Sequence, residues 1–323
     1  MINVLVTGAN GFVGRELCHV LHADGYQVKG SVRRPGVSEQ VAPYDAVVSV
    51  GEIGPDTDWV DALSEVDVVV HLAARVHMMK ETASNPLDAF RQVNALGTER
   101  LALQAAESGV KRFIYVSSIK VNGEGADEVL SENDKPNPTD PYARSKWEAE
   151  QLLSKISAQT GMEVVIVRPP LVYGPGVKAN FLSLIRWVDR GVPLPLGAVK
   201  NRRSLVSVKN LVDLIIKCID HPNAAGEVFL VADEDDISTP ELLRCVAQGV
   251  GKKARLVNVP PRLLKFAFGL IKRREVIERL CGSLVVDIRK AKHLLDWAPP
   301  ISLAQGLSEV TRWYLQEKDN KNA

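Results

Sequence analysis

The chain has 323 residues, and its hydrophobic fraction of 46% and charged fraction of 24% are ordinary for a globular protein with one large domain or two joined ones. Its 40 lysines and arginines nearly balance its 39 aspartates and glutamates, so nothing in the charge indicates a nucleic-acid partner. No apolar run reaches the ~18 residues of a membrane span, and the four scattered cysteines predict neither a disulfide framework nor a metal site.

Short apolar runs alternate with helical patterns through the first half of the chain. We expect strands at 3–6, 27–32, 46–50, 66–72, 112–117 and 164–167, and helices at 12–24, 87–108 and 141–160. Continuous Val, Ile and Leu strands between helices predict an α/β protein with a doubly wound parallel sheet that is covered on both faces. The first strand begins without a basic and apolar leader ahead of it, and we therefore expect a cytoplasmic protein.

Proline and glycine become frequent in the second half of the chain. This change predicts a sheet domain at 1–170 and a smaller C-terminal domain at 171–323, which we expect to bind the substrate at the carboxyl edge of the sheet. Strand-like segments at 203–208 and 228–231 could return to the main sheet, so the boundary is not sharp. We interpret the acidic run at 233–236 as a solvated loop.

A glycine-rich turn joins the first strand to the first helix. Its sequence is Thr7-Gly8-Ala9-Asn10-Gly11-Phe12-Val13-Gly14. Such a turn brings backbone N–H groups and the positive end of a helix to a pyrophosphate, and glycine is needed because a Cβ would block the approach. The context of strand, turn and helix predicts a dinucleotide site formed by Gly8, Asn10, Gly11, Phe12, Val13 and Gly14.

The end of the second strand bears on which dinucleotide binds. An acidic residue there would hold the adenosine ribose 2′-OH, but the sequence has Gly30-Ser31-Val32-Arg33-Arg34. The guanidinium groups of Arg33 and Arg34 suit a 2′-phosphate, which favours NADP(H), while NAD(H) remains open. The alternative is that both arginines are only solvated loop residues.

A tyrosine and a lysine stand four residues apart in the segment Asp140-Pro141-Tyr142-Ala143-Arg144-Ser145-Lys146. Asp140 can cap a helix and Pro141 fits its first turn. Tyr142 and Lys146 then lie on one face of that helix. A free tyrosine has a pKa near ~10, and a lysine ammonium together with a positive nicotinamide ring lowers that pKa. We therefore expect Tyr142 to exchange a proton with a substrate, while Lys146 assists it and holds the cofactor ribose.

The GxxGxxG spacing of the turn and the YxxxK pair resemble the extended short-chain dehydrogenase/reductases, the NAD-dependent epimerase/dehydratase family that acts on nucleotide sugars. The resemblance covers nearly the whole chain and implies a Rossmann fold. It implies a catalytic Ser118, which would hydrogen-bond the reacting sugar oxygen, beside Tyr142 and Lys146. Further cofactor contacts that it implies are Leu72, Ala73, Ala74, Asn94, Ser117 and Pro169.

The resemblance also implies a UDP-sugar substrate. Asn180 and Arg203 match residues that meet the nucleotide diphosphate, and Asp287 would meet the uridine end. It further implies a homodimer formed through the helices at 87–108 and 141–160.

Several reactions are open within this family. The 4,6-dehydratases carry an Asp-Glu pair directly after the catalytic serine or threonine, whereas this chain has Ile119 and Lys120, so dehydration is not expected. The segments 76–80 and 118–123 look most like bacterial 4-ketoreductases of UDP-4-keto-6-deoxy-N-acetylhexosamines, which serve surface polysaccharide and O-antigen assembly. This is the interpretation we favour. The alternative is a 4-epimerase of UDP-glucose or UDP-N-acetylglucosamine, and a more distant one is a non-catalytic NADP sensor.

An apolar and basic segment at 260–274 does not belong to these motifs. It could lie on a membrane surface, or form a helix of the substrate domain with a basic outer face. We favour the second interpretation and expect no membrane insertion.

Overall fold

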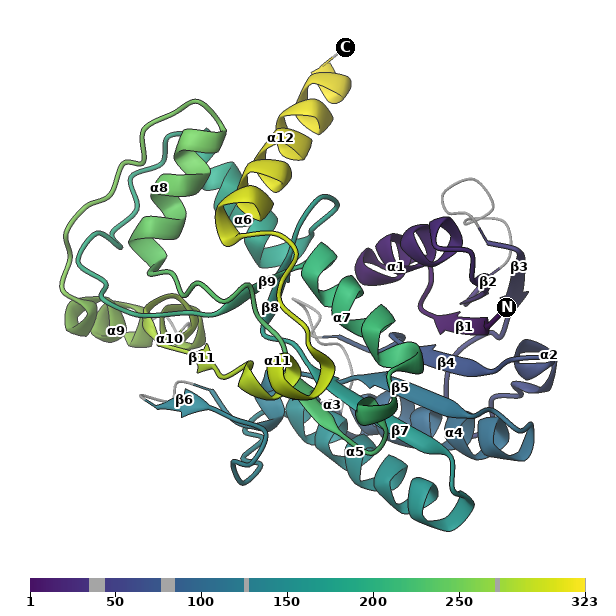
Figure 1. Ribbon diagram of the computed structural model, residues 1–323. Coiled ribbons are helices and arrows are strands. Elements are labelled where there is room, and N and C mark those ends of the chain that lie inside the picture. Colours follow the sequence, from purple (N-terminus) through teal and green to yellow (C-terminus); the bar gives the residue numbers. More distant parts are fainter. Residues whose placement is uncertain (35–43, 77–84, 125–127, 271–273, 323) are drawn as a thin grey trace.

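The structure, a computed structural model, describes residues 1–34, 44–76, 85–124, 128–270 and 274–322. A seven-stranded parallel sheet in the order β10-β7-β5-β4-β1-β2-β3 forms its centre (Figure 1). The strands of this sheet are β1 (Asn3–Thr7), β2 (Gln27–Val32), β3 (Ala46–Ser49), β4 (Val68–His71), β5 (Arg112–Val116), β7 (Glu163–Arg168) and β10 (Val228–Leu230). The predicted α/β fold with a parallel sheet is confirmed.

Helices cover both faces of the sheet, and others build the C-terminal part of the molecule (Figure 1). The α-helices are α1 (Phe12–Ala23), α2 (Val60–Leu63), α3 (Pro86–Arg91), α4 (Gly97–Glu107), α5 (Pro141–Thr160), α6 (Ala179–Asp189), α7 (Val208–Asp220), α8 (Thr239–Gly249), α9 (Pro261–Leu270), α10 (Arg274–Cys281), α11 (Arg289–Leu295) and α12 (Leu303–Asn322). None of the described helices is both long and apolar enough to cross a membrane.

The alternation of side chains along β1 shows how the layers form. Val4 and Val6 are buried in one core together with residues of α1 and α7, whereas Leu5 is buried in a second core with residues of α2, α4 and α5. Successive side chains of a strand point to opposite faces, so an unbroken apolar strand is what a sheet between two helical layers requires.

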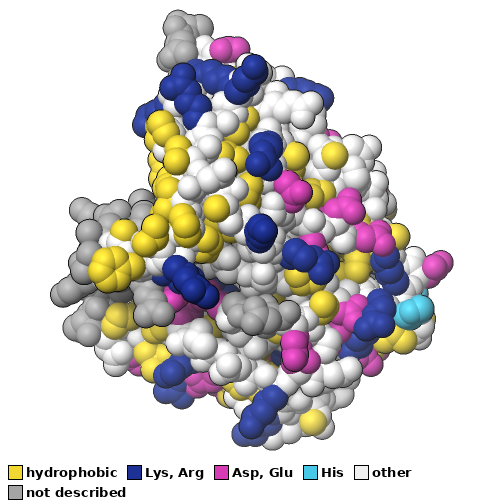
Figure 2. Space-filling view, turned by 90° about the vertical axis from the view of Figure 1, so that its left-hand side faces the viewer, with side chains coloured by type: hydrophobic (Ala, Val, Ile, Leu, Met, Phe, Trp, Pro, Cys, Tyr) yellow, Lys and Arg dark blue, Asp and Glu magenta, His cyan; other side chains and the backbone are white. Residues whose placement is uncertain are grey.

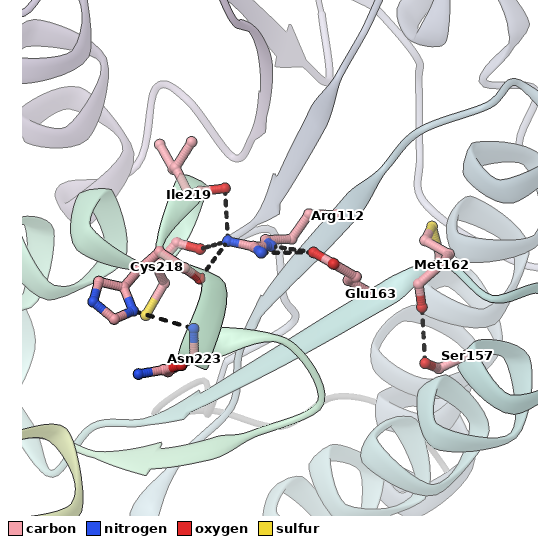
Figure 3. Close-up of polar contacts among 8 residues, drawn as sticks. Arg112, Ser157, Met162, Glu163, Cys218, Ile219 and Asn223 are labelled. Carbon is pink, nitrogen blue, oxygen red and sulfur yellow. Dashed lines mark hydrogen bonds and ion pairs between the residues drawn. The ribbon is translucent and has the colours of Figure 1, made fainter. Parts of the chain in front are cut away.

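Helix α7 comes from the second half of the chain but packs on the sheet, and Arg112 fastens it there (Figure 3). One terminal nitrogen of Arg112 donates to the carbonyl oxygens of Cys218, Ile219 and His221, at 2.8, 2.9 and 3.1 Å. Glu163, on the neighbouring strand, pairs with the opposite side of the guanidinium. Its carboxylate accepts from Nε and lies 2.6 Å from the other terminal nitrogen. The last carbonyls of a helix have no partner within it, and the arginine satisfies them.

The two strand-like segments of the second half have different places. Val228 pairs with Ile166, so β10 extends the main sheet beside β7. The segment expected at 203–208 does not join that sheet: its β9 (Leu205–Ser207) pairs with β8 (Leu171–Tyr173) in a separate two-stranded sheet. A third small sheet joins β6 (Val129–Leu130) to β11 (Val285–Val286). In the main sheet, β10 therefore takes the place beside β7. The chain that follows β9 comes back to the main sheet only as helix α7, which packs on its face.

The acidic run at 233–236 is not wholly a solvated loop, and that expectation was wrong for its first residue. Asp233 is 2% exposed. It accepts hydrogen bonds from the Tyr173 hydroxyl at 2.6 Å, the Ser207 backbone N–H at 2.7 Å and the Asn210 amide at 2.7 Å. Burial raises its pKa, and these hydrogen bonds oppose the shift. Asp233 therefore connects β8, β9 and α7.

Candidate active site

The glycine turn after β1 is as tight as the sequence predicts. Gly8 has φ +66°, and a Cβ on it would lie 3.0 Å from the Cα of Ala73. A Cβ on Gly14 would lie 2.2 Å from the Gly8 oxygen. The next element, α1, begins after Gly11 without a side-chain cap, so N–H groups of its first turn remain available to a ligand. An uncapped helix of 12 residues behind a glycine turn fits a pyrophosphate.

A buried histidine that the sequence analysis did not single out as a site residue supports this turn from below. The Thr7 hydroxyl accepts from the backbone N–H groups of Leu72 and Ala73, both at 3.2 Å. It lies 2.7 Å from Nδ1 of His71, whose Nε2 lies 2.9 Å from the Thr98 hydroxyl. Thr98 donates its own proton to a backbone carbonyl, so we assign the His71 proton to Nε2 and the Thr7 proton to the bond with Nδ1. The neutral ring is then fully hydrogen-bonded and fixes the end of β4.

This histidine makes the protein sensitive to acid. Burial, followed by the nearby Lys146 charge, lowers the pKa of His71 to about 3. Between that value and about 6.5 the unfolded chain binds a proton that the folded chain does not, so stability falls as pH falls, by about 1.4 kcal/mol per pH unit. His71→Gln is expected to reduce the slope of unfolding free energy against pH in urea titrations from pH 7 to 4.5. The exposed control His19→Gln should leave it unchanged, and equal slopes in all three proteins would contradict the assignment.

The helix predicted at 87–108 is interrupted where Asn94 lies. Between α3 and α4 the chain forms one π-helical turn, Gln92–Leu96. The Asn94 amide accepts from Arg75 N–H at 2.8 Å and donates to the Arg75 carbonyl and to the Ser145 hydroxyl, both at 3.0 Å. The extra residue of a π-turn re-aims a side chain, here toward the loop after β4. Asn94 thus connects that loop to α5. Its predicted influence on a bound cofactor would be indirect, through the positions of the loop and of α5.

Ser118, Tyr142 and Lys146 come together as the sequence predicts. Asp140 caps α5 by accepting from the Ala143 N–H at 2.7 Å, and Pro141 follows it as expected. Ser118 stands after β5 and is hydrogen-bonded to the Tyr142 side chain. The ammonium of Lys146 lies 6.0 Å from the centre of the Tyr142 ring, one helical turn along α5.

The expected lowering of the tyrosine pKa is not found in the protein by itself. Burial, and then the charge of Asp140, raise the pKa of Tyr142, and the hydrogen bond with Ser118 opposes them. Lys146 donates instead to the Val116 carbonyl at 2.9 Å. Burial lowers the pKa of Lys146 to about 7, although Glu150 opposes the shift. Ionisation of Tyr142 therefore depends on positive charge beyond that of Lys146.

A buried ion pair lies behind these residues, and the sequence analysis missed it. Glu150, 2% exposed, binds Arg168, 3% exposed, through two guanidinium nitrogens at 3.0 and 2.5 Å. Ser117 donates to Glu150 at 2.5 Å, and Arg168 donates to Asn122 at 3.0 Å. The hydroxyl of Ser117, a predicted cofactor contact, is thus committed to Glu150. The available signal was an acid four residues after Lys146, on the same face of α5.

The residue that replaces a dehydratase acid is itself ion-paired. Lys120 lies 2.5 Å from Glu124 and 2.6 Å from Asp140. Glu124 in turn interacts electrostatically with Arg203. A chain of alternating charges therefore runs from the start of the catalytic helix to the substrate side.

The three predicted substrate residues occupy separate places. Asn180 is exposed in the first turn of α6. Arg203 precedes β9 and donates to the Arg279 carbonyl at 2.8 Å, and burial lowers its pKa. Asp287 follows β11 and pairs with Arg289 at 2.5 Å, which lowers the Asp287 pKa. Their contacts with a UDP-sugar stay predictions.

The remaining predicted contacts lie at the edges of the site. Arg33 and Arg34 are exposed at the end of β2, and Arg33 lies 3.4 Å from the exposed Glu52, an acid that would oppose a 2′-phosphate. The carbonyl of Pro169 accepts from the Ile119 N–H at 3.0 Å and holds the strand end that carries Ser118. The segment His77-Met78-Met79-Lys80, which had favoured a ketoreductase, lies outside the described residues.

Comparison with known proteins identifies the family. The model of the NAD dependent epimerase/dehydratase family matches residues 4–232. The chain belongs to this family. It is 45% identical over 318 residues to a UDP-glucose 4-epimerase of Vibrio cholerae, across 97% of this chain and 96% of the relative.

Two more distant members show the range of the family. An N-acetyl-alpha-D-glucosaminyl-diphospho-ditrans,octacis-undecaprenol 4-epimerase of Escherichia coli O157:H7 is 27% identical over 96% of this chain and 95% of its own length. The solved structure of MoeE5 in complex with UDP-glucuronic acid and NAD is 26% identical, with a TM-score of 0.77, and covers 98% of this chain and 99% of MoeE5.

Proposed function

We propose that this protein is a 4-epimerase of a UDP-hexose, UDP-glucose or UDP-N-acetylglucosamine, with NAD as its resident cofactor. The observation that carries the proposal is the 45% identity to a UDP-glucose 4-epimerase over nearly the whole of both chains. The assembled Ser118, Tyr142 and Lys146 support it. The comparisons thus favour the epimerase alternative over the 4-ketoreductase that the sequence analysis preferred.

The side chains of the site have distinct tasks in this reaction. Ser118 would hydrogen-bond the oxygen on the sugar C4 and Tyr142 would remove its proton, then return it after the keto sugar has turned over. Lys146, fixed between Val116 and Tyr142, would hold the nicotinamide ribose. NAD, when bound, would supply a group that can accept and return a hydride at the sugar C4.

Lys120 supports this choice over a dehydratase. Water elimination needs carboxylates next to the catalytic serine, and that place holds an ammonium paired with Glu124 and Asp140. The 4-ketoreductase keeps two arguments: the resemblance of segment 118–123, and the exposed Arg33 and Arg34, which would suit an exchangeable NADPH.

Two assays on the purified protein decide between the candidates. Heat denaturation should release NAD, identified by chromatography. Incubation with UDP-glucose or UDP-N-acetylglucosamine, without added cofactor, should yield the galacto epimer in proton NMR spectra. Stoichiometric loss of NADPH absorbance on mixing with a UDP-4-keto-6-deoxy-N-acetylhexosamine, without epimer formation, would establish the ketoreductase instead.

A further inference from the structure

Helix α9 presents apolar side chains to solvent. Leu263 and Phe266 are 58% and 70% exposed, and Ala267 beside them is exposed as well. These three positions follow the i, i+3, i+4 spacing of one helical face. Among the residues of α9 whose burial is described, only Leu264 is buried. The outer face of α9 therefore carries apolar side chains in addition to the basic ones that the sequence analysis expected there.

The charged residues nearest to this face in sequence all have one sign, although the neighbouring α10 carries an exposed Glu278. Every charged residue from Lys252 through Arg274 is basic. Arg262 and Lys265, both exposed, lie on α9 next to its apolar face. A helix with exposed Leu and Phe beside Lys and Arg has the composition of helices that lie in the plane of a membrane interface.

The apolar surface continues beyond the helix. Val257, 49% exposed, lies in the segment that leads into α9, and that segment pairs with the loop after α6 through a bridge between Leu194 and Leu256. Val192, at the start of this loop, is exposed too. Figure 2 looks at the side of the molecule that carries α8 and α9, and hydrophobic side chains form a strip there with Lys and Arg side chains beside it.

We propose that α9 and the adjoining strip dock the protein on an anionic lipid surface, with Leu263 and Phe266 inserted among the acyl chains and the basic residues at the phosphate headgroups. The docking is peripheral. It goes beyond the proposed epimerase activity and does not depend on it, because no residue of the catalytic site takes part.

Charge argues against a second copy of the chain as the occupant. An isologous contact places the same patch of both copies face to face, so the basic residues beside α9 would repel their counterparts. Negatively charged lipid attracts them instead. The homodimer that the family resemblance implies would use the helices at 87–108 and 141–160, which cover the sheet and not this side (Figure 1).

Co-sedimentation of the full chain with vesicles tests the proposal. We expect binding to vesicles of phosphatidylglycerol and phosphatidylethanolamine, and little binding to phosphatidylcholine alone. Phe266→Ser should weaken partitioning about tenfold, since it removes a ring that bilayer contact buries. Arg262→Gln with Lys265→Gln should weaken it by about fivefold per charge, and added salt should do the same to the wild type.

Val60→Ser is the matched control, because Val60 is 62% exposed in α2, at the other end of the molecule (Figure 1). It should bind vesicles like the wild type, and all variants should unfold at the same temperature. Equal binding by Phe266→Ser and wild type, or no binding by wild type, would overturn the proposal. Sedimentation velocity that shows a dimer broken by Phe266→Ser would assign the face to a second copy, and a lipid-independent acidic protein partner would overturn it as well.

Discussion

Tyr142→Phe is expected to lower epimerisation about 10²–10⁴-fold, the usual contribution of a positioned acid–base group. The phenyl ring keeps the packing of α5 but cannot take the proton from the sugar C4 hydroxyl. The measurement is the rate of epimer formation by proton NMR, at saturating UDP-glucose.

Measurements of dinucleotide binding and of the unfolding temperature should show that Tyr142→Phe loses activity without unfolding. The variant is expected to keep its dinucleotide and its unfolding temperature, since the cofactor turn and His71 are untouched. Tyr314→Phe is the matched control: it removes a hydroxyl that donates to Asp189 at 2.9 Å, but from α12. It should keep full turnover. A Tyr142→Phe enzyme within tenfold of wild type would refute the assigned role, and a wild type that binds dinucleotide but turns over no sugar would favour the sensor.

The centre of the sheet was predictable because β1, β4, β5 and β7 contain short unbroken apolar runs, as strands buried on both faces do. The strand at 203–208 was misplaced for a physical reason. Its sequence resembles that of β10, and only pairing decides which of the two lies beside β7. The π-turn at Asn94 was not predictable either, because the partners of its Asn94 side chain, Arg75 and Ser145, are far away in sequence.

Some residues of the candidate site could likewise be predicted from the sequence and others could not. Tyr142 and Lys146 were predictable from local spacing, and Asp140 from the capping rule. Glu150 and Asp233 were not, because each is defined by partners in distant segments: Arg168 and Ser117 for Glu150, and Tyr173 for Asp233. Acidic residues in sequence are usually solvated, and only the fold reveals which ones are buried with a partner.

The pattern of 260–274 predicted an amphipathic helix but not which side is covered. An apolar stripe normally faces the core, which is why the sequence favours the buried interpretation. The C-terminal part of the chain has a core of its own, built by α6, α8 and α12. From α9, Leu264 reaches this core. Which face of α9 is exposed is therefore decided by how the helix packs on this core and could not be predicted from its sequence. The domain boundary at 170 stays a prediction.

Glu150→Ala is expected to lower the free energy of unfolding by about 3–5 kcal/mol, because it leaves the Arg168 charge buried without its partner. The two side chains are 2% and 4% exposed, so bulk solvent does not screen the charge that is left. Urea denaturation at pH 7 measures the change. Glu148→Ala is the matched control on the same helix. Glu148 also pairs with an arginine, Arg91 at 2.7 Å, but half of that arginine side chain is in solvent, so little change is expected.

A double variant distinguishes the ion pair from simple packing. Glu150→Gln with Arg168→Met removes both charges, and it should recover much of the stability that Glu150→Gln alone loses. Activity gives a second readout. Since Glu150 opposes the lowering of the Lys146 pKa, Glu150→Gln should move the titration of Lys146 below about 7, and with it the pH profile of epimerisation. A purely structural role would change stability and leave that profile in place. An unshifted profile would therefore mean that Glu150 holds Arg168 and Ser117 without setting the charge of the catalytic lysine.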